Sequence, residues 1–527
     1  MPKGLYILGA GLMQIPAIEA AKRLGLEVTV VDGFSGAMGI SLAHHFLALD
    51  LKDKEGILEA ARKDKNIAGI MTAGTDFSAT VAFVAEKLGL PGIDYETALN
   101  ATHKGLMRKV FDQKGIPSPR FLVYRAGEDI GKISETIGFP CVIKPVDNMG
   151  ARGVKKIYNL TVLKNDIQES LGFSRCGEVI VEEFMEGPEF SVDAIIYQNQ
   201  IQICGIADRH IYFDPFFIEM GHTMPSSFAR DKLNEVENIF IQGIRALGLH
   251  TGAAKGDIKL TKKGPMLGEI AARLSGGYMS GWTYPLSSGI NPAEAAVKIA
   301  VGEDPGKLLP TEKQFSAERA FISVPGMVKG IVHTPKNLID PRIKEVFFRI
   351  KKGDNVLFPR NNVEKCGNII SQADDSEEAS LLCRMMINNI HISLEPGNEN
   401  TEALLYGLGQ SDFPPQCLEF SENENNDFIS ELISGCPHEL PEVLELNIMA
   451  LPKLALEKAI DWYGNTLQEI LGIITQKFAI KWEGEGSKPL SLAFWLSIKR
   501  GGLQGAFHTL ESFATEESRF LKRLGFA

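Results

Sequence analysis

The chain has 527 residues, too many for one hydrophobic core, which predicts roughly three or four domains. Its composition, 44% hydrophobic and 23% charged, is typical of globular protein and excludes global disorder and collagen-like repeats. A formal net charge of -11 argues against a general nucleic-acid or membrane-surface binder, because both classes use basic patches to meet phosphate.

Cysteine usage and hydropathy favour a cytoplasmic protein. The seven cysteines are scattered, and none forms a CxxC pair, so neither a disulfide framework nor a zinc ribbon is indicated. No stretch approaches the roughly eighteen apolar residues that a membrane helix needs. We therefore expect reduced thiols, a cytoplasmic location, and neither a membrane nor a nucleic-acid partner.

The first hundred residues alternate between strand and helix patterns. Strands are predicted at residues 5–8, 27–31, 68–71 and 90–93, and helices at residues 15–24 and 78–88. Short apolar strands separated by helices indicate parallel βαβ units. This pattern predicts a doubly wound, Rossmann-like domain over residues 1–100.

A glycine turn follows the first predicted strand. Gly9-Ala10-Gly11 begins a dinucleotide motif, but the position of its third glycine holds Gln14, and Pro16 follows. A nicotinamide-dependent oxidoreductase, with Asp32 holding a ribose hydroxyl, therefore remains only an alternative. We favour a turn that packs helix against strand.

Residues 101–310 contain residue types that ATP chemistry requires. Lys104 lies at a helix start, and Lys144 closes an apolar strand, where burial is unfavourable without an anion. The loop at residues 147–154 contains Gly150 and Gly153, whose freedom can let backbone N–H groups close over phosphates. Together these features predict a phosphate site.

Further along, residues 179–192 form a strand, a tight turn and a second strand, a hinge whose backbone can bind adenine. Asp257 and Glu269 lie on alternating segments joined by a turn at residues 261–264, and a hairpin would bring the two carboxylates side by side, as a magnesium site requires. Arg273 follows four residues after Glu269. These carboxylates predict a metal site next to a cationic side chain.

With these motifs in this order, residues 1–310 resemble the ATP-grasp superfamily, and residues 315–395 resemble the C-terminal lobe of its L-amino-acid ligase branch. The resemblance implies an α/β protein in four parts. These are a pre-ATP-grasp Rossmann-like domain (1–100), an ATP-grasp domain of two α+β lobes (101–310), a small α+β C-terminal lobe (311–397) and a mostly helical region of unknown role (398–527).

The resemblance also implies ATP and Mg2+ as cofactors and a role for each site residue. ATP is expected to contact Lys104, Lys144, Gly150, Gly153, Glu182, Glu183, Met185 and Glu189, with Glu182, Glu183 and Met185 at adenine and Glu189 at the ribose. Asp257 and Glu269 are the expected metal ligands, and Arg273 is expected to steady the acyl phosphate. Many relatives have asparagine two residues after the second metal carboxylate, where this chain has Ala271, so the number of magnesium ions stays open.

Residues 208–225 resemble the substrate-facing stretch of the family. His222 is a candidate for positioning or deprotonating the incoming amine, and Glu219 for holding its ammonium form. Arg209 is a candidate for meeting the γ-phosphate or a substrate carboxylate. Histidines 44, 45 and 103 lack partners at metal-ligand spacing in the sequence, and we treat them as structural.

Beyond residue 310, strands are predicted at residues 347–350, 355–358 and 366–371, followed by an amphipathic run at residues 377–390. Residues 396–397 and 421–427 have linker composition, and a mostly helical pattern begins near residue 440. For residues 398–527 we leave dimerisation, partner binding and substrate delivery open. A homodimer is one expected assembly.

The expected function is an ADP-forming ligase that activates a carboxylate as an acyl phosphate and couples it to an amine, with small-molecule, amino-acid-like substrates. A carboxylase that uses bicarbonate, or a ligase acting on another metabolite carboxylate, shares all the ATP residues and stays an alternative. A non-catalytic ATP-binding protein is a further alternative, supported within the catalytic block by Ala271.

Overall fold

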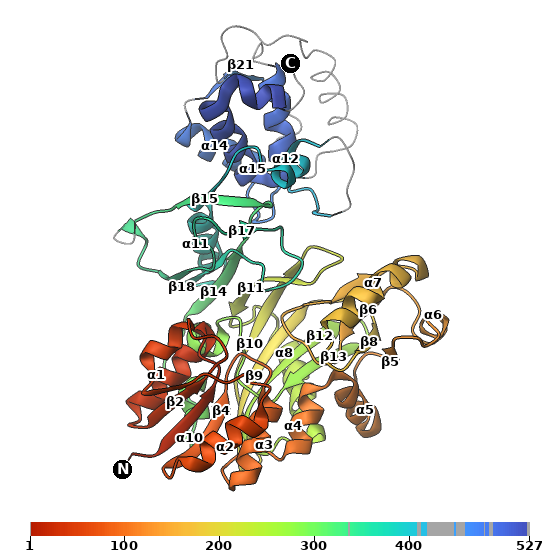
Figure 1. Cartoon of the computed structure of the whole chain (residues 1–527), viewed down its shortest axis with the longest axis vertical. Coiled ribbons are helices and arrows are strands. Elements are labelled where there is room, and N and C mark those ends of the chain that lie inside the picture. Colours follow the sequence, from red (N-terminus) through yellow and green to blue (C-terminus); the bar gives the residue numbers. More distant parts are fainter. Residues whose placement is uncertain are drawn as a thin grey trace. The chain divides into compact units, whose positions relative to one another are not determined.

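The computed structural model describes residues 2–335, 338–407, 413–418, 447–449, 459–478, 480–483 and 488–523. The chain divides into two compact units (Figure 1), which comprise residues 1–319, 360–362 and 370–380, and residues 320–359, 363–369 and 381–527. The four predicted domains stay a prediction. The boundary expected at residue 100 falls inside helix α4 (Tyr95–Thr102).

The first unit opens with a parallel sheet, as the doubly wound pattern predicts. Its strand order is β3-β2-β1-β4, with β1 (Gly4–Leu8), β2 (Glu27–Val31), β3 (His45–Leu47) and β4 (Ile67–Thr72). Its helices are α1 (Ile15–Arg23), α2 (Lys54–Lys63) and α3 (Ser78–Leu88), and α10 (Pro292–Ala300) packs against α1. The strand predicted at residues 90–93 is wrong, because Pro91 and Gly92 interrupt the short apolar run and the chain turns there.

The glycine turn after β1 is filled by the chain itself. Gln14 is buried, and a Cβ added to Gly9 would lie 3.0 Å from the Gln14 side chain. The Asp32 carboxylate accepts the Ala10 N–H at 2.8 Å. The residue that replaces the third glycine therefore occupies the space next to the turn, which supports the packing interpretation over a dinucleotide site.

A four-stranded antiparallel sheet follows helices α4 and α5 (Lys104–Lys114). Its order is β5-β8-β6-β7, with β5 (Phe121–Arg125), β6 (Cys141–Pro145), β7 (Lys155–Ile157) and β8 (Glu178–Glu183). Helices α6 (Gly131–Thr136) and α7 (Leu160–Phe173) contribute Ile133, Leu163 and Ile167 to the core on one face of this sheet.

The largest sheet has the order β13-β12-β9-β10-β11-β14-β18-β16. Its strands within the first unit include β9 (Glu189–Tyr197), β10 (Gln200–Tyr212), β11 (Ile218–Met224), β12 (Gly252–Thr261) and β13 (Gly264–Ala271). Helix α8 (Arg230–Leu247) packs Phe240 into a core with Phe190 and Val192 of β9. Because successive strand residues point to opposite faces, Ser191 and Asp193 face away from this core. The other face is thus free for polar residues.

Towards the second unit the chain continues through β14 (Phe315–Phe321), β15 (Gly326–Val332), β16 (Ile343–Phe348), β17 (Asn355–Val356), β18 (Gly367–Ala373), α11 (Ser376–Asn388) and β19 (His391–Leu394). Strands β15, β17 and β19 form a separate sheet. The strands predicted at 347–350, 355–358 and 366–371 overlap β16, β17 and β18, and α11 confirms the amphipathic run. Strands β14, β15 and β19 were not predicted.

Among the described residues of the rest of the second unit, most are helical. It contains α12 (Glu399–Tyr406), β20 (Asn447–Met449), α14 (Leu467–Lys477), β21 (Lys481–Glu483) and α15 (Lys488–Arg523). Phe494 and Trp495 of α15 are fully buried. The predicted linker at residues 421–427 lies outside the described residues.

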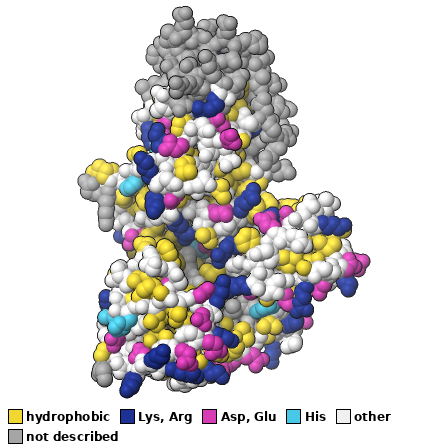
Figure 2. All heavy atoms as spheres, viewed as in Figure 1, with side chains coloured by type: hydrophobic (Ala, Val, Ile, Leu, Met, Phe, Trp, Pro, Cys, Tyr) yellow, Lys and Arg dark blue, Asp and Glu magenta, His cyan; other side chains and the backbone are white. Residues whose placement is uncertain are grey.

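Two surface properties bear on function. None of the described helices combines the length and apolar composition that crossing a membrane requires. On the face shown in Figure 2, Lys and Arg side chains are interspersed with Asp and Glu over the described surface. This mixed face gives no single-sign field of the kind that non-specific nucleic-acid binding uses.

Candidate active site

The two predicted metal carboxylates lie side by side. Strands β12 and β13 form the predicted antiparallel hairpin, and Asp257 is the register partner of Glu269. On the other side of β12, Asp257 pairs in register with Ser191 of β9. Side chains directly opposite one another in an antiparallel pair share a face of the sheet. The hairpin therefore presents two carboxylates on the face opposite α8.

Arg209 of β10 is the centre of an acidic cluster on this face. Its guanidinium contacts Glu189, lies 2.6 Å from Glu219 and lies 2.8 Å from Asp257. Burial would raise the pKa of Asp257, but the charges of Arg209 and Lys255 outweigh burial and the pKa is lowered. Asp257 is thus ionised, and Arg209 neutralises part of the cluster.

Lys104, the first residue of α5, extends to the same face. Its Nζ donates to the Asn148 carbonyl at 2.9 Å and lies 3.3 Å from the Glu269 carboxylate. Burial would lower the pKa of Lys104, but Glu269 outweighs it and the pKa is raised. A buried ammonium therefore stands between the loop after β6 and the second metal carboxylate.

Lys144 of β6 belongs to a second buried ion cluster. Its Nζ lies 2.6 Å from Glu182 of β8, and the Arg108 Nε lies 2.7 Å from the same carboxylate. Burial would raise the pKa of Glu182, but Arg108 and Lys144 outweigh it and the pKa is lowered. Glu182 therefore holds two cations in place at the edge of the hinge.

The glycine loop folds back on itself. Gly153 has φ of 70°, and a Cβ there would lie 2.9 Å from the Phe173 ring, so this position needs glycine for conformation and for space. The Gly150 carbonyl accepts the Asn362 N–H at 2.9 Å, and the Asn362 side-chain oxygen accepts the Glu219 N–H at 2.8 Å. Asn362 thus connects the loop to the substrate-facing strand β11.

The hinge between β8 and β9 joins the two antiparallel sheets. Gly187 passes so close to β12 that a Cβ would lie 2.1 Å from the Leu260 carbonyl oxygen. The Glu183 carboxylate accepts from the Arg120 Nε at 2.8 Å, so this side chain is held at the outer edge. Met185 lies beside β13.

Arg273 is held by a residue from the N-terminal sheet. Its Nη2 and Nε lie 2.7 Å and 2.8 Å from Asp76, which follows β4. The Gly74 N–H also donates to the Leu274 carbonyl at 3.2 Å. The loop after β4 and the segment after β13 are therefore fixed together, and Arg273 receives a two-point contact.

Glu219 and His222 of β11 form a buried chain with Glu318 of β14. The His222 Nε2 lies 3.5 Å from Glu219, and its Nδ1 lies 3.2 Å from Glu318. Burial would lower the pKa of His222, but the two carboxylates outweigh burial and the pKa is raised. A Cβ on Gly277 would lie 3.0 Å from the Glu219 carboxylate, so the turn after Arg273 borders this chain.

All predicted site residues lie in the first unit. Contacts between side chains join most of them, whereas the Glu183 side chain is directed to Arg120. The residues of the site that were not predicted include Asp76, Arg108, Lys255 and Glu318. Local spacing could have indicated two of these residues. Lys255 lies two residues before Asp257 on a strand, and Arg108 lies four residues after Lys104 on a helix, so each shares a face with a predicted site residue. No local spacing indicated Asp76 or Glu318, since their partners are distant in sequence.

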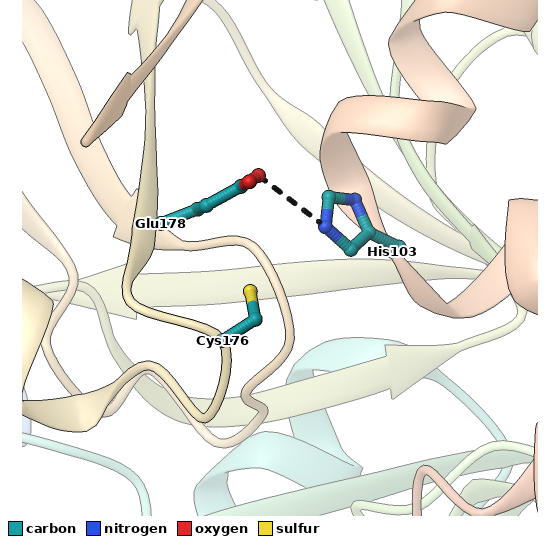
Figure 3. Close-up of side chains that lie close together, drawn as sticks. All are labelled: His103, Cys176 and Glu178. Atoms are coloured by element: carbon teal, nitrogen blue, oxygen red, sulfur yellow. Dashed lines mark ion pairs between the residues drawn. The ribbon is translucent and has the colours of Figure 1, made fainter.

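His103, treated as structural, lies near two other ligand-type side chains (Figure 3). Atoms of His103, Cys176 and Glu178 lie within 4.8 Å of one another. However, His103 Nδ1 accepts the Leu106 N–H at 3.3 Å, which leaves the proton of the neutral ring on Nε2, facing Glu178. Arg125 also donates to Glu178 at 2.8 Å. These bonds favour a helix cap over a metal ligand.

Comparison with known families agrees with this architecture. Residues 18–92 match the ATP-grasp N-terminal domain, residues 137–281 match the ATP-grasp domain, and residues 320–395 match the L-amino acid ligase C-terminal domain 2. The chain therefore contains an ATP-grasp N-terminal domain and an ATP-grasp domain. Within the ATP-grasp superfamily, the chain resembles the L-amino-acid ligase branch.

Individual relatives are distant. The chain is 29% identical over 228 residues to the formate-dependent phosphoribosylglycinamide formyltransferase of Rhodococcus jostii, covering 42% of this chain and 54% of that protein. It is 25% identical over 334 residues to carnosine synthase 1 of Gallus gallus, covering 58% and 36%. The solved L-amino acid ligase of Bacillus licheniformis has the same fold, with a TM-score of 0.64, 22% identity and coverage of 75% and 99%. The chain thus spans about half or less of these two curated relatives.

Proposed function

We propose that this chain is an ADP-forming ligase that activates a carboxylate as an acyl phosphate and joins it to an amine. The observation that carries the proposal is the Asp257–Glu269 pair, with Lys104 at one side and Arg209 at the other. Carboxylates paired across a hairpin and flanked by buried cations supply what phosphoryl transfer needs, namely positioning and charge stabilisation.

The same geometry supports our assignment of the ATP contacts. Lys104 and Lys144 provide buried ammonium groups for the phosphates, and the loop containing Gly150 and Gly153 closes over them. Glu182, Glu183 and Met185 of the hinge border adenine, and Glu189 takes the ribose hydroxyls. In this role Glu189 exchanges its contact with Arg209 for a hydrogen bond to the nucleotide.

The residues present fit magnesium. Asp257 and Glu269 are hard oxygen donors, and next to Asp257 the Ser191 hydroxyl is buried without a hydrogen-bond partner among the described residues. Burying such a hydroxyl is unfavourable unless a ligand or water satisfies it. When bound, magnesium would neutralise charge on the transferring phosphoryl group.

The proposed chemistry has two steps. A substrate carboxylate oxygen bonds to the γ-phosphorus while the bond to the β-bridging oxygen breaks, giving an acyl phosphate and ADP. The amine nitrogen then attacks the acyl carbon, the C–O bond to phosphate breaks, and a proton leaves the nitrogen. Arg273, held by Asp76, stabilises the negative charge of the acyl phosphate and of the tetrahedral adduct.

The amine is assigned to Glu219 and His222. Glu219 and Glu318 raise the pKa of His222 and so favour its imidazolium form relative to an ordinary histidine, which suits His222 better as an orienting donor than as the base. The Glu219 carboxylate lies 3.5 Å from the His222 Nε2 and is suited to hold an ammonium group. Amino-acid-like substrates are supported by the L-amino acid ligase C-terminal domain match and by the carnosine synthase relative.

The test is release of ADP and phosphate from purified protein with ATP and Mg2+, screened against pools of amino acids and small carboxylates. Glu269→Ala and Arg273→Ala are the active-site variants, and Glu19→Ala, an exposed residue of α1, is the matched control. We expect turnover that needs both a carboxylate and an amine, retained in the control and lost in the active-site variants.

Other results separate the alternatives. Turnover with bicarbonate, or with formate and no amino acid, would assign the chain to a carboxylase or metabolite ligase instead. ATP binding without turnover against any pool would favour the non-catalytic interpretation, and the absence of ATP binding would refute the proposal.

A further inference from the structure

The position two residues after Glu269 offers no metal ligand. Ala271 lies on the same face of β13 as Glu269, since residues two apart on a strand point the same way. Its register partner on β12 is Lys255, and Lys255 also pairs in register with Asp193 of β9. A methyl group thus lies opposite a lysine on the face that carries the two metal carboxylates.

The Lys255 ammonium is directed into the site. Its Nζ contacts the Asp257 carboxylate, and its side chain is 15% exposed. Its charge also acts on Asp193 and on Glu269. The Asp257 carboxylate thus contacts this ammonium, and on the neighbouring strand Asp193, the register partner of Lys255, has an Oδ1 that is buried without a hydrogen-bond partner in the described structure.

This arrangement leaves room for one divalent cation rather than two. Mg2+ requires close to six oxygen ligands in near-octahedral geometry. Between Asp257 and Glu269 those oxygens can come from both carboxylates, ATP and water. On the Ala271 side, a second ion would meet a methyl group and the positive charge of Lys255, which repels it at short range.

We propose that the Lys255 ammonium takes the place of a second magnesium ion, so that the site uses one Mg2+ and one lysine to neutralise the triphosphate. This inference rests on the proposed function, because it assumes that ATP binds at the Asp257–Glu269 pair. The lysine is supplied by the chain itself, and Asp257 contacts its ammonium group.

The experiment counts metal ions. The purified full chain is dialysed to equilibrium against Mn2+ and the non-hydrolysable analogue adenylyl imidodiphosphate, and both bound species are quantified. The wild type is compared with the double variant Lys255→Ala/Ala271→Asn and with Lys263→Met, which removes an exposed lysine from the turn of the same hairpin. Electron paramagnetic resonance of the bound Mn2+ provides a second readout, because two ions roughly 4 Å apart couple magnetically.

We expect one Mn2+ per bound analogue in the wild type and in Lys263→Met. The double variant should retain two, with a spectrum that shows exchange coupling. Two Mn2+ per analogue in the wild type would overturn the inference while leaving the proposed ligase intact, and this result is decisive even where the double variant does not fold. A folded double variant that retains one Mn2+ would also overturn the role of Lys255. No binding of the analogue would instead refute the proposed function, and this inference with it.

Discussion

The two units bury histidine with opposite electrostatic outcomes. In the first unit, His222 lies between Glu219 and Glu318, and its pKa is raised. In the second unit, burial lowers the pKa of His391 to about 3 and that of His508 to about 4, with nearby cations adding to the effect. All three rings are almost fully buried. The charge of the neighbouring groups, and not the extent of burial, therefore decides whether the pKa of a buried histidine is raised or lowered.

The same contrast extends to other buried groups. The site in the first unit holds Arg108, Glu182 and His222 in ion pairs. In the second unit, Asp461 accepts hydrogen bonds from the Asn465 backbone and side chain, and Asn465 also bonds Asn388. Satisfied polar networks fix a core, whereas charged groups facing a common surface are available to a ligand.

The largest expected effect on turnover comes from Arg273→Ala. Removing a preorganised cation next to the reacting groups should reduce kcat by roughly 100- to 1,000-fold. Arg245→Ala, an exposed arginine of α8, should retain wild-type activity. Arg245→Ala should melt close to the wild type, whereas Arg273→Ala should melt at a lower temperature because Asp76 loses its buried partner. Equal turnover in the two variants would remove Arg273 from the mechanism.

A smaller loss is expected for Asp76→Asn, which keeps the shape of the side chain but removes its charge. Losing one charge-assisted contact to Arg273 should lower kcat on the order of 10-fold. Because Asp76 positions Arg273 and does not contact ATP in the proposed mechanism, the KM for ATP should change little. A variant with unchanged kcat and a raised KM for ATP would contradict this role.

The variant Glu318→Gln directly tests the comparison between His222 and the buried histidines of the second unit. Removing one of the two carboxylates should lower the pKa of His222, measured from the histidine Cε1 proton by NMR titration. A raised folded pKa contributes stability that is present below the unfolded value of 6.5 and is lost as pH rises through the folded pKa. In Glu318→Gln, the stability contributed by His222 should therefore be lost at a lower pH than in the wild type. An unchanged titration would show that Glu219 alone sets the pKa, and Glu312→Gln, an exposed glutamate, is the control.

No change in turnover at neutral pH is expected for His508→Gln in the second unit. The folded pKa of His508 is depressed from 6.5 to about 4, so its stability contribution is present above pH 6.5 and is lost as pH falls towards 4. The wild type should lose up to about 3 kcal/mol over this range through His508, and the variant should lose less. Thermal melts at several pH values, with His333→Gln as the exposed control, measure the difference. If the melting temperatures of the wild type and of His508→Gln depended equally on pH, the lowered pKa of His508 would be contradicted.

Local features of the fold and site were predictable from the sequence. The turn at residues 261–264 predicts the hairpin, but a register shift between Asp257 and Ile258, which the turn does not encode, places Asp257 opposite Glu269. The strand predicted at residues 90–93 was wrong because an apolar run does not outweigh Pro91-Gly92. The contacts of Arg273 with Asp76 and of His222 with Glu318 join residues 197 and 96 positions apart, and such pairs depend on tertiary packing that no local pattern encodes.

The attachment of the β4 loop to the segment after β13 has a consequence for engineering. Ala73 forms a parallel bridge with Leu274, Gly74 donates to the Leu274 carbonyl, and Asp76 holds Arg273. A chimaera that exchanged only the N-terminal α/β layer with a relative would carry a foreign partner for Arg273. Residues 73–76 and 273–277 should therefore be exchanged together in any such chimaera, so that Arg273 keeps its own partner.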